Sequence, residues 1–564
     1  MRRSMSLVAC AALAAAATAA DLVPKPKEVK TTEGTWTLPA ADRACILVGP
    51  KASGPVKYAA EMLQHDLAAR FGWKPAIRTG DAAPADRQAV IVLGTRADLP
   101  ALVTPPKDAV DTPDGYTLFT SGTGATLVAA VVGANERGVI YGQDTLRQLI
   151  RRAGDGLVLP RSSVRDWPTI PWRGQPTSRY VRFLEPGALD GALRARLNYI
   201  DLRNDSMGLK LGSVGEKERK DLAQIVAEAH RRGLFVYGTY RSGVRASQVP
   251  ALLEAFEKLI DLGCDGVWIS YDDTGGGADP IPTIRAVVDM AKSHGITGRA
   301  IGYTPPSRAK PIGDYHTLNS PHDVLLKAVP EMKRALYIIT RPPSKREHEF
   351  AARRGLNRWT WWHNWPRGFS GPSGDRPHVS NPLASHLGLR RVRRPTYAGA
   401  PWMQHGWHRP DVEKMRNADA FIDGVHFWGT IPQIEYLQRT MGLWGWDPGT
   451  YDERRTRLAT FRIIFGPAAA EEAARFEDAL LKVKSLARSY RRNRGKSLAE
   501  MRSDPATADA LKAMTAALAI IAKTAPAETL IDPKRLTSYY VEPMRREIET
   551  LTAFIGAAKA KAEK

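Results

Sequence analysis

Cysteine is scarce in this sequence, with three among 564 residues. Cys10 lies in the apolar N-terminal segment, whereas Cys45 and Cys264 lie far apart in apolar surroundings. A framework of disulfide bonds is therefore excluded, and we expect Cys45 and Cys264 to be buried thiols. Long apolar runs are also missing after residue 20. Because a membrane-spanning helix needs about 18 or more apolar residues, we expect no membrane span in the mature protein.

The sequence also lacks the motifs of several common enzyme classes. No glycine-rich phosphate turn follows the first strand of the central region, which disfavours an open dinucleotide-binding sheet. No Gly-x-Ser-x-Gly elbow supports a catalytic serine. The scattered histidines of one region lack the spacing of a two-ligand zinc motif; these are His363, His405, His408 and His426. We therefore expect an activity that needs neither a metal ion nor an organic cofactor.

Acidic residues are outnumbered by basic ones, 59 against 81, and the formal net charge is +22. A charge of this size can attract nucleic acid. Here the basic residues are spread along the chain, and aromatic residues do not alternate with them as in a single-strand binding platform. The charge therefore predicts a solvated cationic surface and no nucleic-acid partner.

The N-terminus is typical of an exported protein. Two arginines precede an apolar segment over 5–17, and Thr18, Ala19 and Ala20 form a small-residue cleavage site before Asp21. Residues 7–10, LVAC, are similar to a lipoprotein box, but the apolar segment continues beyond Cys10, which favours cleavage over a lipid anchor. We expect a periplasmic or extracellular protein after removal of residues 1–20.

The length suggests three or four domains, and the apolar pattern separates three regions after the signal peptide. Residues 21–168 contain candidate strands at 44–48, 89–93, 116–120 and 126–132, and amphipathic helices at 56–71 and 136–150. This pattern predicts a small α+β domain. The proline-rich residues 166–174 then predict an extended linker.

The central region, residues 173–450, alternates apolar strands with helical patterns. Candidate strands lie at 198–203, 234–240, 267–271, 299–303, 336–340, 359–363 and 425–428, with helices at 218–232, 249–262 and 284–294. Seven or eight such units predict an α/β fold of the (β/α)8 TIM barrel type. In residues 451–564 the strand pattern disappears, and helical segments at 468–490, 506–523 and 544–561 predict a C-terminal helical bundle.

One candidate strand of the barrel ends in two adjacent acids. Residues 264–277 read CDGVWISYDDTGGG, a β-branched and aromatic strand followed by Asp272, Asp273 and a glycine-rich loop. At the carboxyl end of a barrel strand, such a pair favours acid/base chemistry on a neutral polar substrate such as a sugar. Two alternatives stay open: the acids brace the loop, or they bind a metal ion together with Asp279.

Longer stretches of the sequence are similar to known glycoside hydrolases. Residues 133–149, GANERGVIYGQDTLRQL, resemble the accessory α+β domain that precedes the barrel of bacterial β-hexosaminidases. Residues 265–273, DGVWISYDD, resemble the catalytic strand of family 84 glycoside hydrolases, the O-GlcNAcase-type β-N-acetylglucosaminidases. The segments 361–365, WWHNW, and 444–451, WGWDPGTY, resemble later barrel segments of that family, in the same order.

This resemblance implies an exported, retaining β-N-acetylhexosaminidase that acts on a glycan or glycoconjugate by substrate-assisted catalysis. Asp272 would orient and polarise the N–H of the 2-acetamido group, whose oxygen attacks the anomeric carbon. Asp273 would serve first as general acid and then as general base. Together with the strand ends and the tryptophans, which stack on sugars, the resemblance predicts a set of substrate-binding residues: Gly174, Arg203, Asp205, Tyr303, Trp362, Asn364 and Trp428.

The sequence departs from family 84 at the positions that hold the sugar. Residues 175–180 read QPTSRY where that family has a Glu-Gly-Phe-Tyr-Gly run, and Arg203 stands in place of a lysine. Two further hypotheses for the function therefore stay open. The protein could be a barrel glycosidase for another glycan, for example one with a uronic acid whose carboxylate meets Arg203, or a catalytically silent glycan-binding protein.

Overall fold

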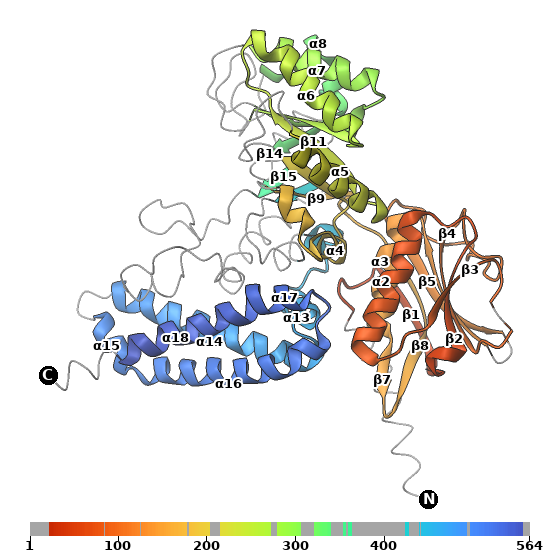
Figure 1. The fold of residues 1–564 in the computed structure, drawn as a ribbon, viewed down its shortest axis with the longest axis vertical. Helices are drawn as coiled ribbons and strands as arrows, with labels where there is room; N and C mark the ends of the chain where they lie inside the picture. The colour runs from red at the N-terminus through yellow and green to blue at the C-terminus, as the bar shows by residue number, and fades with distance from the viewer. Residues whose placement is uncertain are drawn as a thin grey trace, which may run out of the picture. The chain divides into compact units, whose positions relative to one another are not determined.

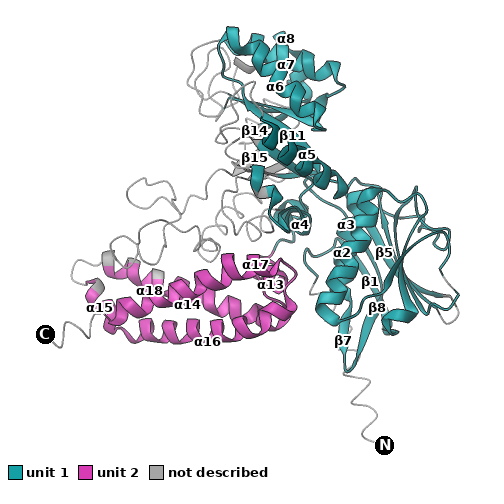
Figure 2. Cartoon of the chain, viewed as in Figure 1, with its two compact units in different colours: residues 1–364, 414–430, 441–451 teal, residues 365–413, 431–440, 452–564 magenta. Residues whose placement is uncertain are grey.

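The structure is a computed structural model that describes residues 22–83, 85–123, 126–177, 180–203, 215–271, 279–305, 321–339, 353–356, 359–363, 424–427, 439, 442–492 and 497–556. The chain divides into two compact units (Figure 2). The first comprises residues 1–364, 414–430 and 441–451, and the second comprises residues 365–413, 431–440 and 452–564. The first unit holds a sheet domain and a ring of parallel strands, and the second holds a bundle of helices.

The N-terminal domain is built on a mixed sheet of eight strands. Its order is β1-β8-β5-β6-β4-β2-β3, with β7 paired to β8. The pairs among β2, β3, β4 and β6 are parallel, and those that involve β1, β5, β7 and β8 are antiparallel. The strands are β1 (Glu28–Leu38), β2 (Ala44–Val48), β3 (Ala76–Thr79), β4 (Ala89–Thr95), β5 (Tyr116–Thr123), β6 (Thr126–Gly133), β7 (Arg151–Ala153) and β8 (Gly156–Asp166).

Two helices, α2 (Gly54–Phe71) and α3 (Glu136–Leu149), lie side by side on one face of this sheet (Figure 1). Helix α3 approaches the sheet closely: a Cβ atom at Gly138 would lie 2.1 Å from the carbonyl oxygen of Gly115. The helix begins after Asn135, whose side-chain oxygen accepts a hydrogen bond from the Gly138 N–H at 2.9 Å. The cap and the glycine in the motif at 133–149 thus serve the contact between helix and sheet.

Eight further strands pair side by side in parallel, from β9 to β16, and β16 pairs back with β9 to close a ring. Helix α4 (Ala188–Arg194) follows β9, and α5 (Glu216–Arg231), α6 (Val249–Asp261), α7 (Ile281–Ser293) and α8 (Pro321–Ala328) follow the next four strands in turn. The strands are β9 (Trp172–Thr177), β10 (Tyr199–Arg203), β11 (Phe235–Arg241), β12 (Gly266–Ser270), β13 (Ile301–Thr304), β14 (Leu336–Ile339), β15 (Trp359–His363) and β16 (Gly424–Phe427).

The described residues therefore show a mixed α/β fold in which strand and helix alternate over the first five strands of the ring, β9 to β13. The connections after β14 and β15 lie largely outside the described residues. The predicted linker at 166–174 is wrong in its second part, because β9 begins at Trp172 and already belongs to the ring. Pro171 lacks only its own N–H, so the strand starts directly after it.

The sheet domain and the ring share buried charges. Asp114 accepts hydrogen bonds from Arg137 Nε at 2.7 Å, Arg173 Nη2 at 2.9 Å and Asn198 Nδ2 at 2.8 Å. Burial alone would raise the pKa of the Asp114 carboxyl, but the two guanidinium groups lower it well below its ordinary value. Arg137 also donates to the carbonyl oxygen of Gly233, just before β11. These contacts hold α3 against the ring.

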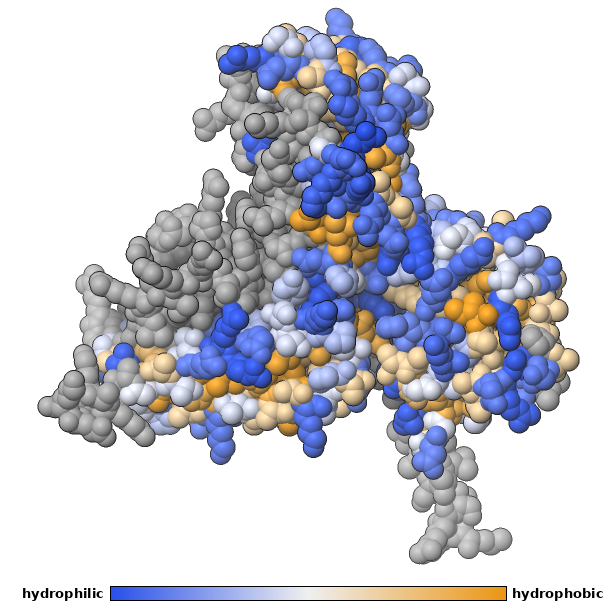
Figure 3. Space-filling model, in the orientation of Figure 1, coloured by the Kyte–Doolittle hydropathy of each residue, from blue (hydrophilic) through white to orange (hydrophobic). Residues whose placement is uncertain are grey.

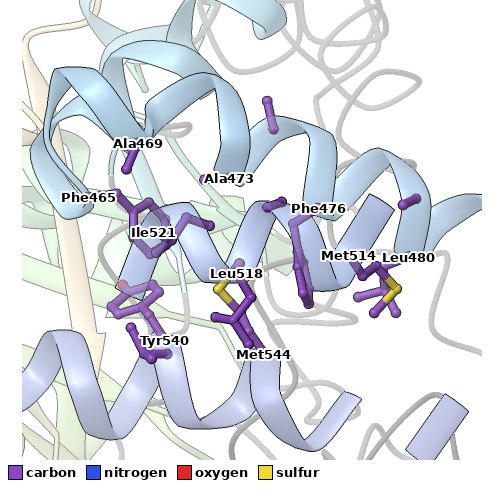
Figure 4. Close-up of a cluster of buried hydrophobic side chains, with 14 of the residues drawn as sticks. Phe465, Ala469, Ala473, Phe476, Leu480, Met514, Leu518, Ile521, Tyr540 and Met544 are labelled. Carbon is purple, nitrogen blue, oxygen red and sulfur yellow. The ribbon is translucent and has the colours of Figure 1, made fainter. Parts of the chain in front are cut away.

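The second unit is a bundle of α13 (Glu453–Ile464), α14 (Pro467–Arg492), α15 (Leu498–Ser503), α16 (Pro505–Glu528), α17 (Pro533–Arg535) and α18 (Glu542–Gly556). Its core is apolar (Figure 4), with Phe476, Met514 and Met544 among the fully buried side chains. Among the described residues, α16 alone is long and apolar enough to cross a membrane, and it packs against α14 and α18. The absence of a membrane span stays a prediction.

Both predicted thiols, Cys45 and Cys264, are free and buried, which confirms that part of the sequence analysis. Cys45 lies in β2, in a core shared with β4 and β6, and Cys264 precedes β12. On the face shown in Figure 3, hydrophilic side chains are spread over the described residues, and hydrophobic side chains form smaller patches among the hydrophilic ones.

Candidate active site

The inner face of the ring is identified by its aromatic residues. Trp172, Tyr199, Tyr237 and Trp268 come from four consecutive strands and form one buried cluster together with Leu336 of β14. Neighbouring rings lie 5.1–5.4 Å apart between centroids. The alternate residues of each strand point outward; on β11, for example, Tyr240 contacts Phe256 of α6 edge to face. Because side chains alternate along a strand, these positions fix which residues of each strand face the interior.

A polar layer lies above this aromatic floor, two residues further along β10, β11 and β12 and at the matching register position of β13. It consists of Asp201, Thr239, Ser270 and Thr304, all of which are buried. The Thr239 hydroxyl donates to the Asp201 carboxylate, and Thr304 Oγ1 accepts from the Trp268 indole N–H at 3.0 Å. These residues were not predicted from the sequence. Their period-2 spacing from the inward aromatic residues is the signal that could have found them.

The end of β12 is held in place on both sides. Ser270 accepts a hydrogen bond at its carbonyl oxygen from Ser242 N–H at 2.7 Å, and Tyr271 N–H donates to the Thr304 carbonyl at 3.0 Å. The Tyr271 side chain points outward and its hydroxyl donates to the Pro280 carbonyl at 3.3 Å. The chain therefore leaves the carboxyl end of the ring, between β11 and β13, at the residue before Asp272.

The predicted catalytic residues, Asp272 and Asp273, lie outside the described residues, as do three predicted substrate-binding residues: Asp205, Asn364 and Trp428. Arg203 is the last residue of β10 and pairs in register with Thr239. Trp362 lies in β15, where it pairs with His426 of β16. The described residues therefore place these two backbone positions in the ring, while the roles of all these residues stay predictions.

The predicted contact of Tyr303 with substrate is wrong. Tyr303 is fully buried on the outer face of β13, where its ring lies 5.2 Å from that of Tyr337 and 6.4 Å from that of Tyr271. The strand continues to Thr304, and Thr304 is the residue that faces the interior. An error of one residue at the strand end moved the predicted side chain to the opposite face.

Gly174 has a packing role, and its predicted role in substrate binding stays a prediction. A Cβ atom at this position would lie 2.1 Å from two atoms of the Tyr199 ring. Tyr199 is itself fully buried in the aromatic floor. The glycine thus leaves room for this ring, and the ring covers the inner side of Gly174.

Asp279, the third acid of the metal hypothesis, has a local structural role. Its side-chain oxygen accepts a hydrogen bond from Ile281 N–H at 3.0 Å, at the start of α7. In the part of the chain that the structure describes, no three His, Cys, Asp or Glu side chains come together as a possible metal site. The expectation of an activity without a metal stays a prediction.

The sheet domain is the part of the chain that a known family matches. Residues 19–167 match glycosyl hydrolase family 20, domain 2. This match agrees with the hexosaminidase-like accessory domain expected from the sequence. A comparison with curated protein sequences finds no match.

Solved structures show similarity over almost the whole chain. CpGH84B superposes with a TM-score of 0.62 at 13% identity, over 95% of this chain and 91% of that chain, which shows a common fold. The chitobiase FjGH20 of Flavobacterium johnsoniae has a TM-score of 0.46 at 13% identity, over 96% of this chain and 93% of that one. The domain match supports a glycoside hydrolase, the enzyme class expected from the sequence, and the superposition on CpGH84B shows the fold.

Proposed function

We propose that this protein is an exported, retaining β-N-acetylhexosaminidase with a complete (β/α)8 barrel. The observation that carries the proposal is the position of β12. Its carboxyl end, directly before Asp272 and Asp273, belongs to a ring of parallel strands above a buried polar layer. Enzymes built on such rings act at the carboxyl ends of the strands. The match to a family 20 domain and the fold shared with CpGH84B support the same class.

The proposed chemistry needs one acid to orient the substrate and one to transfer protons. Asp272 accepts a hydrogen bond from the N–H of the 2-acetamido group and so orients this group. The acetamido oxygen then attacks the anomeric carbon as the glycosidic bond breaks. Asp273 donates a proton to the leaving oxygen and later removes one from the water that opens the oxazoline intermediate. Two displacements at one carbon return the original configuration, which gives retention.

The aromatic floor and the polar layer lie beneath the strand ends at which this chemistry is proposed to take place. The four aromatic side chains of the floor are packed together below the polar layer, which favours a substrate site at the carboxyl end of the strands. Asp201 and Thr239 lie one layer below the strand ends, bonded to each other. Rigid neighbours of this kind keep catalytic groups in a fixed position.

The test is the release of 4-nitrophenol from its β-N-acetylglucosaminide and β-N-acetylgalactosaminide by the full-length protein. The proposal expects turnover of at least one substrate, with the β-anomer of the free sugar as the first product in an NMR time course. Asp273→Asn serves as the control for contaminating hydrolases. No release with either substrate contradicts the proposal, and sugar binding without release would support a silent glycan-binding protein instead.

A further inference from the structure

We propose that the outer side of helix α16 is an interaction surface on which a second copy of this chain packs, so that the two copies of α16 form an antiparallel pair. The surface consists of residues that recur at intervals of four and three positions, and we call it the α16 stripe: Asp509, Ala513, Ala516, Ile520, Lys523 and Ala527. The contact belongs to the helical bundle and does not depend on the proposed enzymatic function.

The α16 stripe is exposed although the helix is apolar. All six of its residues are exposed, and Ile520, at 40% exposure, is one of four large hydrophobic side chains exposed among the described residues. Of the 18-residue apolar segment of α16, 33% is buried inside the structure. The helix lies at the edge of the bundle (Figure 1), where hydrophobic side chains reach the surface (Figure 3). An apolar surface with charges at its ends is typical of a contact with a partner.

A bilayer is a poor partner for this helix. The inner side of α16 contributes Met514 and Ile521 to the core of the bundle, where α16 packs against α14 and α18. The helix therefore cannot enter a membrane without leaving that core. On its outer side the charges of Asp509, Lys512 and Lys523 interrupt the apolar residues, and a charge in hydrocarbon is costly. A protein surface that meets these charges with opposite ones is favoured instead.

The charges of the α16 stripe identify the partner as a second copy of the chain. Asp509 and Lys523 stand at opposite ends of the stripe, about 21 Å apart along the helix axis, with Ala516 midway between them. In an antiparallel pair centred on Ala516, Asp509 of each chain lies opposite Lys523 of the other, which gives two ion pairs. A parallel pair would place equal charges together. The stripe is therefore complementary to itself in one orientation.

The middle of the stripe supplies the apolar contact of the pair. Ala513, Ala516 and Ile520 lie between the two charges, and intervals of three and four residues keep one side of a helix towards a partner helix. Small side chains let the two helix axes approach closely, near the lower limit of about 8 Å. A contact through a single helix lies at the low end of interface sizes, near or below about 1,200 Å². We therefore expect a weak dimer with a micromolar dissociation constant.

The experiment is sedimentation velocity of the full-length protein at concentrations from about 1 to about 200 µM, where a micromolar dimer changes from mostly dissociated to mostly associated. Ala516→Glu places two carboxylates together at the centre of the pair and should raise the dissociation constant at least about tenfold. Ala522→Glu is the matched control, because Ala522 is exposed on the same helix about a third of a turn away. It should leave the dimer unchanged, and circular dichroism should show both variants folded.

Charge reversal tests the orientation. Asp509→Lys and Lys523→Asp should each weaken the dimer by about three- to tenfold, because each places like charges opposite one another. The double reversal restores both ion pairs of an antiparallel dimer and should restore the affinity, whereas in a parallel dimer it restores nothing. A protein that stays monomeric at about 200 µM, a dimer that survives Ala516→Glu, or a double reversal without recovery overturns the proposal. Flotation of the monomer with phosphatidylglycerol vesicles would assign the surface to a membrane and overturn it equally.

Discussion

The guanidinium of Arg194, at the end of α4, donates from both terminal nitrogens to the carboxylate of Asp66 in α2, at 2.6 Å each. Both side chains are buried. Burial would raise the pKa of Asp66, but Arg194 outweighs it and lowers that pKa well below its ordinary value. The pair therefore joins the sheet domain to the ring as two ions, each of which neutralises the other.

We expect Asp66→Asn and Arg194→Met each to lower the free energy of unfolding by about 3–5 kcal/mol, because each removes the bidentate partner of a buried charge; after Arg194→Met, Asp66 keeps only the longer contact of 3.4 Å with Arg147 Nε and the one with His65. Urea-induced unfolding followed by tryptophan fluorescence measures the loss. The double variant should lose less than the sum of the two. As a control, Asp221→Asn breaks an exposed pair with Lys217 and should cost less than about 1 kcal/mol. Equal losses for the buried and the exposed pair would contradict the assignment.

Asp166 should make stability depend on pH in the opposite sense to most acids. It is buried, and its Oδ2 accepts from Trp446 Nε1 at 2.8 Å and from the Tyr116 hydroxyl at 3.2 Å. Burial raises its pKa from 3.8 to about 6, against the effects of Arg196 and the Trp446 hydrogen bond. The folded protein therefore holds this proton more tightly than the unfolded chain does between about pH 4 and pH 6.

We expect the contribution of Asp166 to stability to fall by about 3 kcal/mol in total as the pH rises from about 4 to about 6. Above about pH 6 the contribution should stay constant. The pKa values of Asp66 and Asp114 are lowered, so their contributions to the stability of the protein are lost below about pH 4 instead. The measurement is therefore the difference between wild type and Asp166→Asn in urea unfolding across pH 4–8. A difference that does not change with pH would contradict the raised pKa.

Gly174→Ala tests the packing role of this glycine. The new methyl group would meet the Tyr199 ring at 2.1 Å, and overpacking of this kind typically costs about 1–3 kcal/mol. Thermal unfolding should show the loss, while KM of the protein that remains folded stays unchanged. Gly54→Ala is the control, since a Cβ there has no neighbour within 4 Å. A raised KM with normal stability would support the predicted role in substrate binding.

Tyr303→Phe tests the outward position of Tyr303. Its hydroxyl is buried and has no hydrogen-bond partner among the described residues, so its removal should not lower stability. Activity should stay within about twofold of wild type, because the Tyr303 hydroxyl lies on the outer face of β13, away from the proposed site. Tyr271→Phe, which removes the bond to Pro280, should instead cost about 1 kcal/mol. A selective loss of substrate affinity in Tyr303→Phe would contradict this position.

The two predicted catalytic acids should differ in their response to the leaving group. Asp273→Asn should lower kcat/KM for unactivated glycosides by about 10²–10⁴ and for 4-nitrophenyl glycosides much less, since nitrophenolate leaves without a proton. Asp272→Asn should lower both. Asp279→Asn, which affects the start of α7, should reduce stability and treat both leaving groups alike. Small, equal effects at Asp272 and Asp273 would contradict the assignment of their roles.

Apolar strands were predictable from the sequence and polar ones were not. The strands Ala44–Val48 and Trp359–His363 lie where the apolar pattern placed them. By contrast, β1 was missed because most of its residues are polar and exposed, so it has no buried face to mark it. Strand β9 was missed because two prolines precede it, although proline constrains only its own position and the residue before it.

The sequence by itself determined the order of the elements, the buried thiols and the two acids placed after a buried strand, because these depend on local patterns of apolar residues. Only the tertiary structure decided which face Tyr303 and Thr304 occupy, since one residue of register reverses a side chain. The tertiary structure also decided that Arg173 and Arg194 are buried in ion pairs. In the sequence both are ordinary surface charges, but Asp114 and Asp66, 59 and 128 positions away, pair with them in the interior. Burial of such charges is favourable only when distant partners meet.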